Sequence, residues 1–306
     1  MKDIFFSIII PTYNRVKKLQ IAVDSIMSQK FNNWELIIID NYSTDKTKEM
    51  IKKYGSKKIK FFSLHNNGNI AKSRNFGIKR SKGKFLAFLD SDDYWTSDKL
   101  SYCAEIINKN KDIKLIYHDM EIDEKKIFLK KRKTSYLRKL TKPVFNDLIS
   151  NGPTFATSSA IVEKKIFNKI GQFSEDKNLI TWEDYDAWIR LSKKTNSFYK
   201  ISKVLGTYTF DGDNTLKPNR SIRNIFYFKK NYLDGKSNKL PNWCNYSLMR
   251  SYYVEKDYKK SIKYLKQIKL QEYSLVNKIK LLFFLVMIKI KISFNYFPKI
   301  MSKSIN

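Results

Sequence analysis

The sequence predicts an α/β protein with a Rossmann-like, mainly parallel central sheet and a helical C-terminal appendage. Two features lead to this fold class. Apolar segments of strand length alternate with amphipathic segments of helix length over residues 1–100, which is the pattern of a parallel sheet with crossover helices. Two of the apolar segments also run directly into carboxylates, and open α/β sheets hold their ligands at such strand ends.

The first predicted strand covers residues 5–10, and Pro11 marks the turn after it because proline cannot donate to a strand ladder. Asn14 is the expected N-cap of the following helix. Apolar residues recur in that helix at helical spacing, so one face is expected to be buried. They are Leu19, Ala22, Val23 and Ile26.

Residues 34–40 repeat the strand pattern and end in Asp40. Ser43 or Thr44 is the expected cap of the next helix, and Gly55 is expected to end it. This second strand and helix complete the first repeat of the alternating pattern, so the two strands are expected to be parallel neighbours.

A third strand is expected at residues 60–64, and a turn at Gly68 and Asn69 leads into a helix through Arg74 and Asn75. Neither a G-x-G-x-x-G fingerprint nor a P-loop is present in the sequence. A nucleotide would therefore be held by side chains and a metal ion.

The fourth predicted strand, residues 85–89, runs into the acidic residues Asp90, Asp92 and Asp93. Because side chains alternate along a strand, Asp90 and Asp92 point the same way if the extended geometry persists. Two converging carboxylates offer oxygen ligands to a hard divalent cation that bridges a diphosphate.

Sixty basic residues against 29 acidic ones give the 306-residue chain a net charge of +31. Such a charge implies attraction to phosphates, nucleic acid or an acidic membrane surface, although a lysine-rich composition can also produce it. With only Cys103 and Cys244, no disulfide framework or thiolate metal site is readable, and a cytoplasmic location is expected. No segment approaches the roughly 20 apolar residues that span a bilayer.

Four segments, at residues 7–15, 36–45, 67–75 and 88–93, fall at predicted strand ends or the turns after them. In this order they resemble the motifs of family 2 glycosyltransferases, which are inverting, nucleotide-sugar-dependent enzymes with the GT-A fold. Asp90-Ser91-Asp92 stands where that family has its Asp-x-Asp motif.

The resemblance implies a nucleotide-sugar site. Its residues are Pro11, Thr12, Tyr13, Arg15, Asp40, Asn41, Ser43, Gly68, Arg74, Asn75, Asp90, Ser91 and Asp92. Tyr13 would line the base pocket, Asp40 would hydrogen-bond the base, and Arg74 would face the diphosphate. Asp90 and Asp92 would hold Mn²⁺ or Mg²⁺. Simple packing of Tyr13, a turn role for Asp40 and a solvated Arg74 are the alternatives.

Beyond the acidic cluster, a helix is expected from Ser97 or Asp98, a short strand at residues 115–117, and an exposed excursion or loose hairpin over 121–142. Residues 151–173 then resemble the family's segment of loop, strand and helix that closes on a G-x-F turn.

Glu183 and Asp184 lie at or just before the first turn of a helix, where the helix dipole favours their ionised forms. The resemblance identifies this pair with the family's E-D motif, whose carboxylate deprotonates the acceptor hydroxyl. Asp184 is the predicted base, with Glu183 as the acceptor-orienting or alternative base. A pair of helix caps is the alternative interpretation.

The expected domains are a GT-A catalytic domain at 1–215 and a basic helical region at 216–306. The first comprises a nucleotide-sugar-binding half at 1–100 and an acceptor half at 101–215. In the C-terminal region a helical hairpin is expected at 246–268. Residues 281–294 are too short to span a bilayer and fit either a surface-lying amphipathic helix or a strand.

The predicted function is that of a metal-dependent, inverting, hexosyltransferase-type enzyme that uses a UDP-sugar. A lipid-linked saccharide acceptor in bacterial polysaccharide or lipopolysaccharide biosynthesis is expected, with peripheral contact at the inner face of the membrane. The alternatives are a basic nucleic-acid-binding protein and a non-catalytic scaffold on the same fold. No nucleic-acid-binding motif is present, so no nucleic-acid partner is expected.

Overall fold

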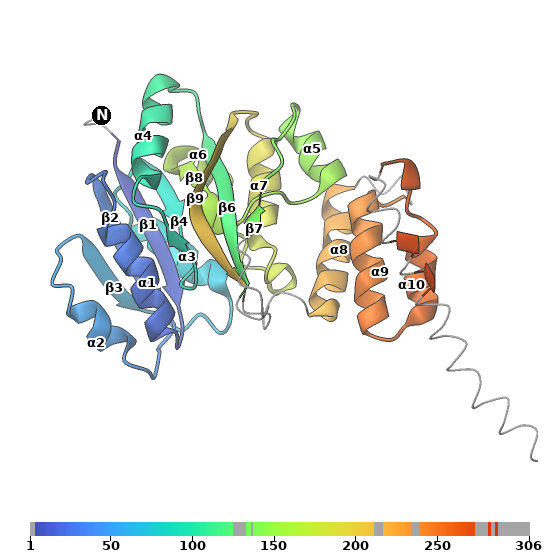
Figure 1. The fold of residues 1–306 in the computed structure, drawn as a ribbon, viewed down its shortest axis with the longest axis horizontal. Coiled ribbons are helices and arrows are strands. Elements are labelled where there is room, and N and C mark those ends of the chain that lie inside the picture. Colours follow the sequence, from blue (N-terminus) through green and yellow to red (C-terminus); the bar gives the residue numbers. More distant parts are fainter. Residues whose placement is uncertain are drawn as a thin grey trace, which may run out of the picture. The chain divides into compact units, whose positions relative to one another are not determined.

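The computed structural model describes residues 4–124, 133–135, 137–210, 217–233, 239–272, 281–282 and 285–286. The chain divides into two compact units, one of residues 1–148 and 153–212 and the other of residues 149–152 and 213–306. The first unit contains a nine-stranded sheet of order β3-β2-β1-β4-β8-β6-β9-β5, with β7 paired to β6 (Figure 1).

The N-terminal part of the sheet is parallel, as predicted. Strands β1, β2 and β3 pair in parallel, and β4 pairs in parallel with β1. They cover Phe6–Thr12, Trp34–Asp40, Ile59–Ser63 and Phe85–Phe88.

Strand β1 continues through Pro11, which the sequence placed in a turn. Pro11 is in register with Ile39 of β2. Thr12 accepts a hydrogen bond from Asn41 on the β2 side, and successive residues face opposite sides of a strand. The missing N–H of Pro11 therefore faces β4, whose pairing with β1 ends at Ile9 and Phe88. Proline costs no ladder hydrogen bond at that position.

Three helices connect these strands: α1 at Val16–Met27, α2 at Thr47–Lys52 and α3 at Ile70–Arg80. The predicted buried face of α1 is confirmed. The predicted caps of α1 and α2 are wrong. Asn14 instead binds Thr44 across the two loops, and Asp45 accepts from the first amide of α1. Polar loop residues that could cap their own helix brace a neighbouring loop here.

The second part of the sheet mixes directions. Its strands are β5 at Tyr94–Trp95, β6 at Leu115–Glu124, β7 at Lys133–Ser135, β8 at Ile161–Glu163 and β9 at Phe198–Phe210. Strand β6 runs parallel to β9 but antiparallel to β7 and β8. The short strand predicted at 115–117 is thus the start of a ten-residue strand, and β7, within the expected excursion, pairs antiparallel with it.

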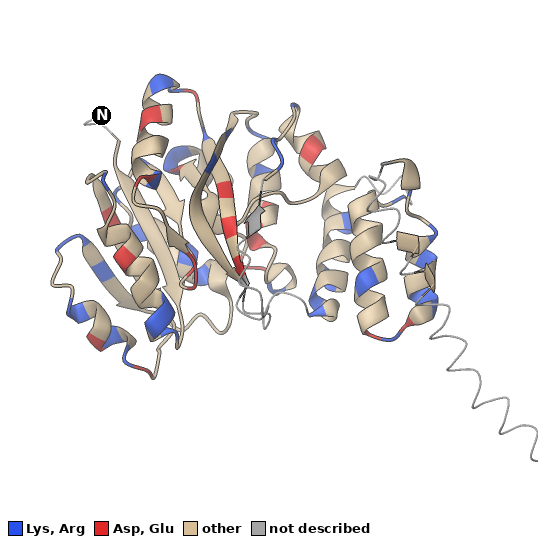
Figure 2. Ribbon diagram, in the orientation of Figure 1, with Lys and Arg blue, Asp and Glu red and all other residues tan. Residues whose placement is uncertain are grey.

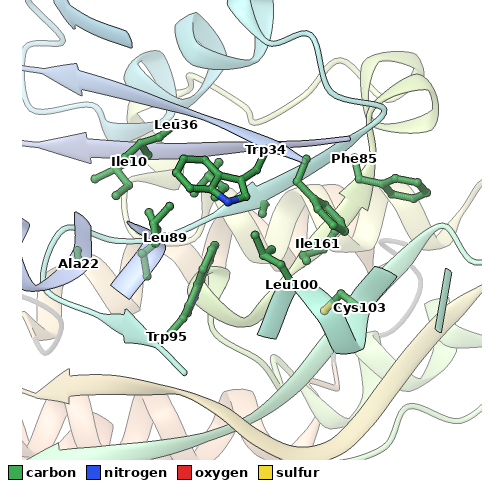
Figure 3. Close-up of a cluster of buried hydrophobic side chains, with 14 of the residues drawn as sticks. Ile10, Ala22, Trp34, Leu36, Phe85, Leu89, Trp95, Leu100, Cys103 and Ile161 are labelled. Carbon is green, nitrogen blue, oxygen red and sulfur yellow. The ribbon is translucent and has the colours of Figure 1, made fainter. Parts of the chain in front are cut away.

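Helices cover both faces of the sheet. On one face, α1 and α4 bury a cluster that includes Trp34, Trp95 and Leu100 (Figure 3). On the other face, Phe88 contacts Phe167 and Phe173 at ring-centroid distances of 5.8 and 4.9 Å. The helices of this part are α4 at Lys99–Lys109, α5 at Val144–Asn151, α6 at Lys164–Lys169 and α7 at Glu183–Ser192. Short 3₁₀ turns lie at Thr157–Ser159 and Lys177–Leu179.

The second unit is helical where it is described. It contains α8 at Pro218–Tyr232, α9 at Asn242–Val254, α10 at Tyr258–Leu265 and a 3₁₀ turn at Leu270–Glu272. The hairpin predicted within 246–268 corresponds to α9 and α10. Most of the segment 281–294 lies outside the described residues. Within the described ranges, no helix has the length and apolarity needed to cross a membrane.

Candidate active site

A pocket of about 600 Å³, measured with its open mouth, lies at the carboxyl ends of β1 and β2 and beside the start of α3. Most of its lining comes from residues predicted for the nucleotide-sugar site, and Asn66 and Ile70 are additions. The lining residues are Pro11, Thr12, Tyr13, Arg15, Asn41, Asn66, Gly68, Ile70 and Ser91. These residues come together because their loops follow adjacent parallel strands, and their role in binding stays a prediction.

Asn66 holds the two sides of this pocket together. Its backbone N–H donates to the Asn41 side chain at 2.9 Å, and its side-chain oxygen accepts from the Gly68 N–H at 2.9 Å. Its amide nitrogen donates to the Ser73 hydroxyl at 2.9 Å. This bracing role could be suspected only from the polar Asn-Asn-Gly turn, which by itself indicates no partner.

Tyr13 and Asp40 differ in their access to the pocket. The Tyr13 ring is 53% exposed, so core packing does not explain it. Asp40 is 4% exposed, and its two carboxylate oxygens accept hydrogen bonds from the Ser43 N–H and hydroxyl. The structure therefore gives Asp40 and Ser43 a loop-forming contact next to the pocket.

The Asp-x-Asp segment is a turn, so the expected alternation of its side chains is wrong. The Asp93 N–H donates to the Asp90 carbonyl at 3.0 Å, which ends the extended geometry. Each carboxylate pairs with a different arginine: Asp90 with Arg74 at 2.6 Å, and Asp92 with Arg15 at 2.5 Å. The side chains of Asp90 and Asp92 remain 30% and 23% exposed beside the pocket.

Asp93 connects this turn to strand β9. It is 1% exposed and accepts from the Thr209 N–H of β9 at 2.9 Å. Burial, reinforced by Asp90, holds the pKa of Asp93 well above its usual range, and the same two causes raise the pKa of Asp92. Clustered carboxylates with raised pKa values form a site that gains from a bound cation.

The carboxylates of Asp90 and Asp92 suit Mn²⁺ or Mg²⁺. Both are hard oxygen donors at the edge of the pocket, and Mg²⁺ usually takes one or two carboxylates plus substrate phosphates and waters. No three His, Cys, Asp or Glu side chains of the described ranges are grouped to hold a metal by themselves. The donor set therefore fits a cation that is shared with a diphosphate.

The acidic pair begins helix α7, as predicted. Asp184 is half-buried and accepts from the Thr157 hydroxyl at 2.7 Å. Burial raises the pKa of Asp184, and the Thr157 hydrogen bond opposes that shift. Glu183 is 5% exposed, and burial raises its pKa to about 7 although Arg74 lowers it.

Arg74 does not line the pocket, contrary to the expectation that it faces a diphosphate. It is 3% exposed and bridges two carboxylates, with Nη1 2.6 Å from Glu183 and Nη2 2.6 Å from Asp90. Asn75 also turns away from the pocket. Its amide exchanges hydrogen bonds with the Phe173 backbone and reaches Glu175. A local sequence motif does not reveal which distant residue forms hydrogen bonds with a side chain of the motif.

Three further residues meet the carboxylates without having been predicted. The Ser158 hydroxyl accepts from the Asp90 backbone N–H at 3.0 Å and hydrogen-bonds the Asp93 carboxylate, and the Thr157 hydroxyl donates to Asp184. Burial raises the pKa of Tyr208 to about 12, with further contributions from Asp93, Asp90, Asp92 and Asp184. The serine- and threonine-rich stretch at 154–159 has no periodicity that would indicate its place in the fold.

A family model described as Glycosyl transferase family 2 matches residues 7–171. An uncharacterized glycosyltransferase of Rickettsia bellii is 32% identical over 72% of this chain, but the chain spans only 31% of that relative. The amylovoran biosynthesis glycosyltransferase AmsB of Erwinia amylovora is 30% identical over 68% of this chain and 70% of its own length. The UDP-Glc:alpha-D-GlcNAc-diphosphoundecaprenol beta-1,3-glucosyltransferase WfgD of Escherichia coli is 29% identical over 64% of this chain and 73% of its own length.

Two solved structures share the fold. S. aureus TarS in complex with UDP-GlcNAc aligns with a TM-score of 0.60 at 18% identity, over 87% of this chain and 82% of that one. The mannosyltransferase PcManGT from Pyrobaculum calidifontis, in complex with GDP-Man and Mn2+, aligns with a TM-score of 0.58 at 15% identity, over 92% and 79% of the two chains. The predicted GT-A fold is thereby confirmed.

Proposed function

Because the chain belongs to glycosyl transferase family 2, we propose that it is a metal-dependent, inverting glycosyltransferase that moves a sugar from a UDP-sugar to a saccharide acceptor. The observation that carries this proposal is one continuous arrangement. A pocket with an exposed aromatic ring adjoins Asp92, and Asp90 is linked through Arg74 to the acidic pair of α7. We assign the donor to residues 1–100 and the acceptor to 101–215.

The donor would lie with its base over Tyr13 and its diphosphate toward Arg15 and the Asp-x-Asp turn. Tyr13 offers an exposed face for stacking, and Arg15 is the cationic side chain of the pocket lining. The complex of TarS with UDP-GlcNAc, a protein of the same fold, supports a uridine donor.

In the transfer step, Asp184 takes the proton of the acceptor hydroxyl while that oxygen bonds to the anomeric carbon. The bond from this carbon to the diphosphate breaks, and its electron pair leaves with the nucleoside diphosphate. Attack opposite the leaving group inverts the configuration. Asp90 and Asp92 would hold Mn²⁺ or Mg²⁺, which when bound supplies positive charge beside the leaving diphosphate. The Mn2+ complex of PcManGT supports this choice.

We further propose a lipid-linked acceptor in surface-glycan biosynthesis, met at an anionic membrane surface by the basic region 216–306. The name of WfgD describes a diphosphoundecaprenol acceptor. In this chain, Lys259, Lys263 and Lys266 are exposed at spacings of four and three residues along and just after α10, and we call them the α10 lysine face. Lysines of this kind suit an acidic lipid surface.

Calorimetric titration of UDP, with and without Mn²⁺, tests the donor site in the wild type, Asp92→Asn and the matched control Asp112→Asn. Asp112 is exposed in a loop after α4. We expect Mn²⁺-dependent UDP binding in the wild type and the control, and its loss in Asp92→Asn. Transfer to an acceptor is then measured with UDP-sugars.

No UDP binding under any metal condition would contradict the uridine donor and direct the search to dTDP- and GDP-sugars. Binding of nucleic acid that persists in Asp92→Asn would favour the alternative of a basic nucleic-acid-binding protein. UDP binding without transfer to any acceptor would favour a non-catalytic scaffold.

A further inference from the structure

We propose that Arg74 is a positioning residue that couples the Asp-x-Asp turn to the base helix α7, and that it does not bind the donor diphosphate. The proposal rests on the proposed function for its kinetic consequences, while its structural consequence can be measured without turnover. Arg15 and Arg74, which the sequence placed together in the donor site, therefore have different roles: Arg15 binds the donor, and Arg74 holds two carboxylates.

The guanidinium of Arg74 is committed on both sides. Its Nη1 and Nη2 each lie 2.6 Å from a carboxylate oxygen, of Glu183 and Asp90 respectively. The side chain is 3% exposed, and its guanidinium carbon lies 5.4 Å from the centre of the Phe173 ring. Arg15, by contrast, is 33% exposed and lines the pocket. Of these two arginines, Arg15 is therefore the one placed to meet a ligand.

The bridge joins three elements that are distant in the chain. Arg74 belongs to α3, Asp90 follows β4, and Glu183 is the first residue of α7. Asp184 directly follows Glu183 in the chain. The contact between Arg74 and Glu183 therefore holds the start of α7, and with it the proposed base Asp184, in position. Glu183 is 5% exposed and Asp184 is half-buried, so Asp184 is the more accessible carboxylate of the pair.

Moving Arg74 to a diphosphate would break both ion pairs and leave Glu183 buried without its cation. Removing one partner of a buried pair is strongly unfavourable because the remaining charge is uncompensated. A planar guanidinium also presents its donors as a fixed fork, which suits two carboxylates on either side. Geometry and charge therefore both favour a structural bridge.

The test compares Arg74→Lys and Arg74→Gln with the matched variants Arg15→Lys and Arg15→Gln. We expect the Arg74 variants to lower kcat by about 100-fold, since small displacements of a catalytic group have costs of that order, with UDP affinity unchanged. Lysine should rescue little because a point charge cannot bridge both carboxylates. The Arg15 variants should weaken UDP binding and leave the α7 helix unaffected.

Hydrogen exchange provides the readout that is independent of activity. The Asp186 N–H donates to the Trp182 carbonyl at 3.0 Å in the first turn of α7. We expect this turn to exchange faster in the Arg74 variants, with the loops at 11–15 and 41–43 unchanged. Glu183→Gln, whose amide oxygen can still accept from Arg74, should retain most of the protection of this turn.

Weakened UDP binding in the Arg74 variants with unchanged kcat, or unchanged exchange in α7, would overturn the proposal. If Arg74→Gln does not fold, Arg74→Lys should still show the faster exchange of α7, and Glu183→Gln should still show the retained protection. Failure of the wild type to bind UDP would refute the proposed function, yet faster exchange at the start of α7 in the Arg74 variants would still support the bridge.

Discussion

At the scale of single residues, Glu183 and Asp184 have different surroundings although they are adjacent in the chain. Glu183 is almost fully buried and held by Arg74. Asp184 is half-buried and accepts a hydrogen bond from Thr157. A base needs access to the hydroxyl that it deprotonates, so this difference in access supports Asp184 as the proposed base.

Replacing Asp184 by Asn removes the proposed base with little change in shape. We expect kcat to fall by about 10²–10⁴-fold, the usual contribution of general base catalysis. UDP affinity should be unchanged because Asp184 does not line the pocket. Steady-state kinetics and calorimetry measure the two quantities, with Asp112→Asn as the control. Full activity of Asp184→Asn would contradict the assignment.

The pH dependence of the transfer reports the same carboxylates. Burial raises the pKa of Asp184, and burial raises that of Glu183 to about 7. Rates should therefore fall as the pH drops and the base becomes protonated, with an apparent pKa that lies above that of an ordinary aspartate and belongs to the pair.

The variant Thr157→Val tests the sign of this dependence. Thr157 donates to the ionised form of Asp184 and so lowers its pKa. Losing that hydrogen bond should raise the pKa and move the acid limb of the pH–rate profile up by about one pH unit. Thr154→Val, which is outside this contact, serves as the control. A shift toward lower pH would contradict the proposed role of the hydrogen bond.

The chemistry of these residues was predictable from the sequence, but their partners were not. The strand-end motifs include Tyr13 and Arg15, which line one pocket, and Asp92, which pairs with Arg15, because parallel strands end at a common edge. Arg74 and Asn75 also belong to one of the strand-end motifs. Their partners Glu183 and Phe173, however, lie about a hundred residues further along the chain. When the hydrogen-bond partners of a buried polar side chain lie far away in the sequence, the neighbouring residues do not reveal them.

At the scale of elements, α3 approaches the sheet closely because Gly77 has no side chain. A Cβ at Gly77 would lie 2.8 Å from both Ile39 Cδ1 and Ile9 Cγ2. We expect Gly77→Ala to lower the free energy of unfolding by about 1–3 kcal/mol through overpacking. Helix propensity alone would predict a gain of about 1 kcal/mol.

Urea denaturation distinguishes these outcomes for Gly77→Ala. Lys79→Ala, an exposed position of the same helix, should change stability by less than about 0.5 kcal/mol. A stabilised Gly77→Ala protein would mean that α3 can move away from β1 and β2 at little cost.

Strand β6 shows why element lengths were harder to predict than element types. Apolar residues define its start at 115–117, but His118 and Asp119 are also buried. Asp119 pairs with Lys200 at 3.0 Å and accepts from the Leu137 N–H. In the sequence alone, buried polar residues whose partners are distant look like the beginning of a loop.

At the scale of the molecule, Lys and Arg occur throughout both units, whereas most of the described Asp and Glu residues belong to the first unit (Figure 2). The acidic residues of the proposed active site contrast with the α10 lysine face, in which Lys259, Lys263 and Lys266 point to solvent. Leu270, shortly after this face, is 52% exposed. These exposed lysines, and an exposed apolar residue four positions further along the chain, support the proposed contact with a lipid surface.

Replacing Lys259, Lys263 and Lys266 by Gln should therefore weaken binding to vesicles that contain anionic lipid. At about 1 kcal/mol per lysine near such a surface, we expect roughly a 100-fold loss. The control replaces Lys48, Lys52 and Lys53, exposed residues of and beside α2, with the same change in net charge. Vesicle co-sedimentation measures binding, which should fall with added salt, while UDP affinity stays unchanged in both variants. Equal losses in the two triple variants would mean that the attraction follows net charge alone, whereas a loss confined to the α10 lysine face would identify that face as the membrane contact.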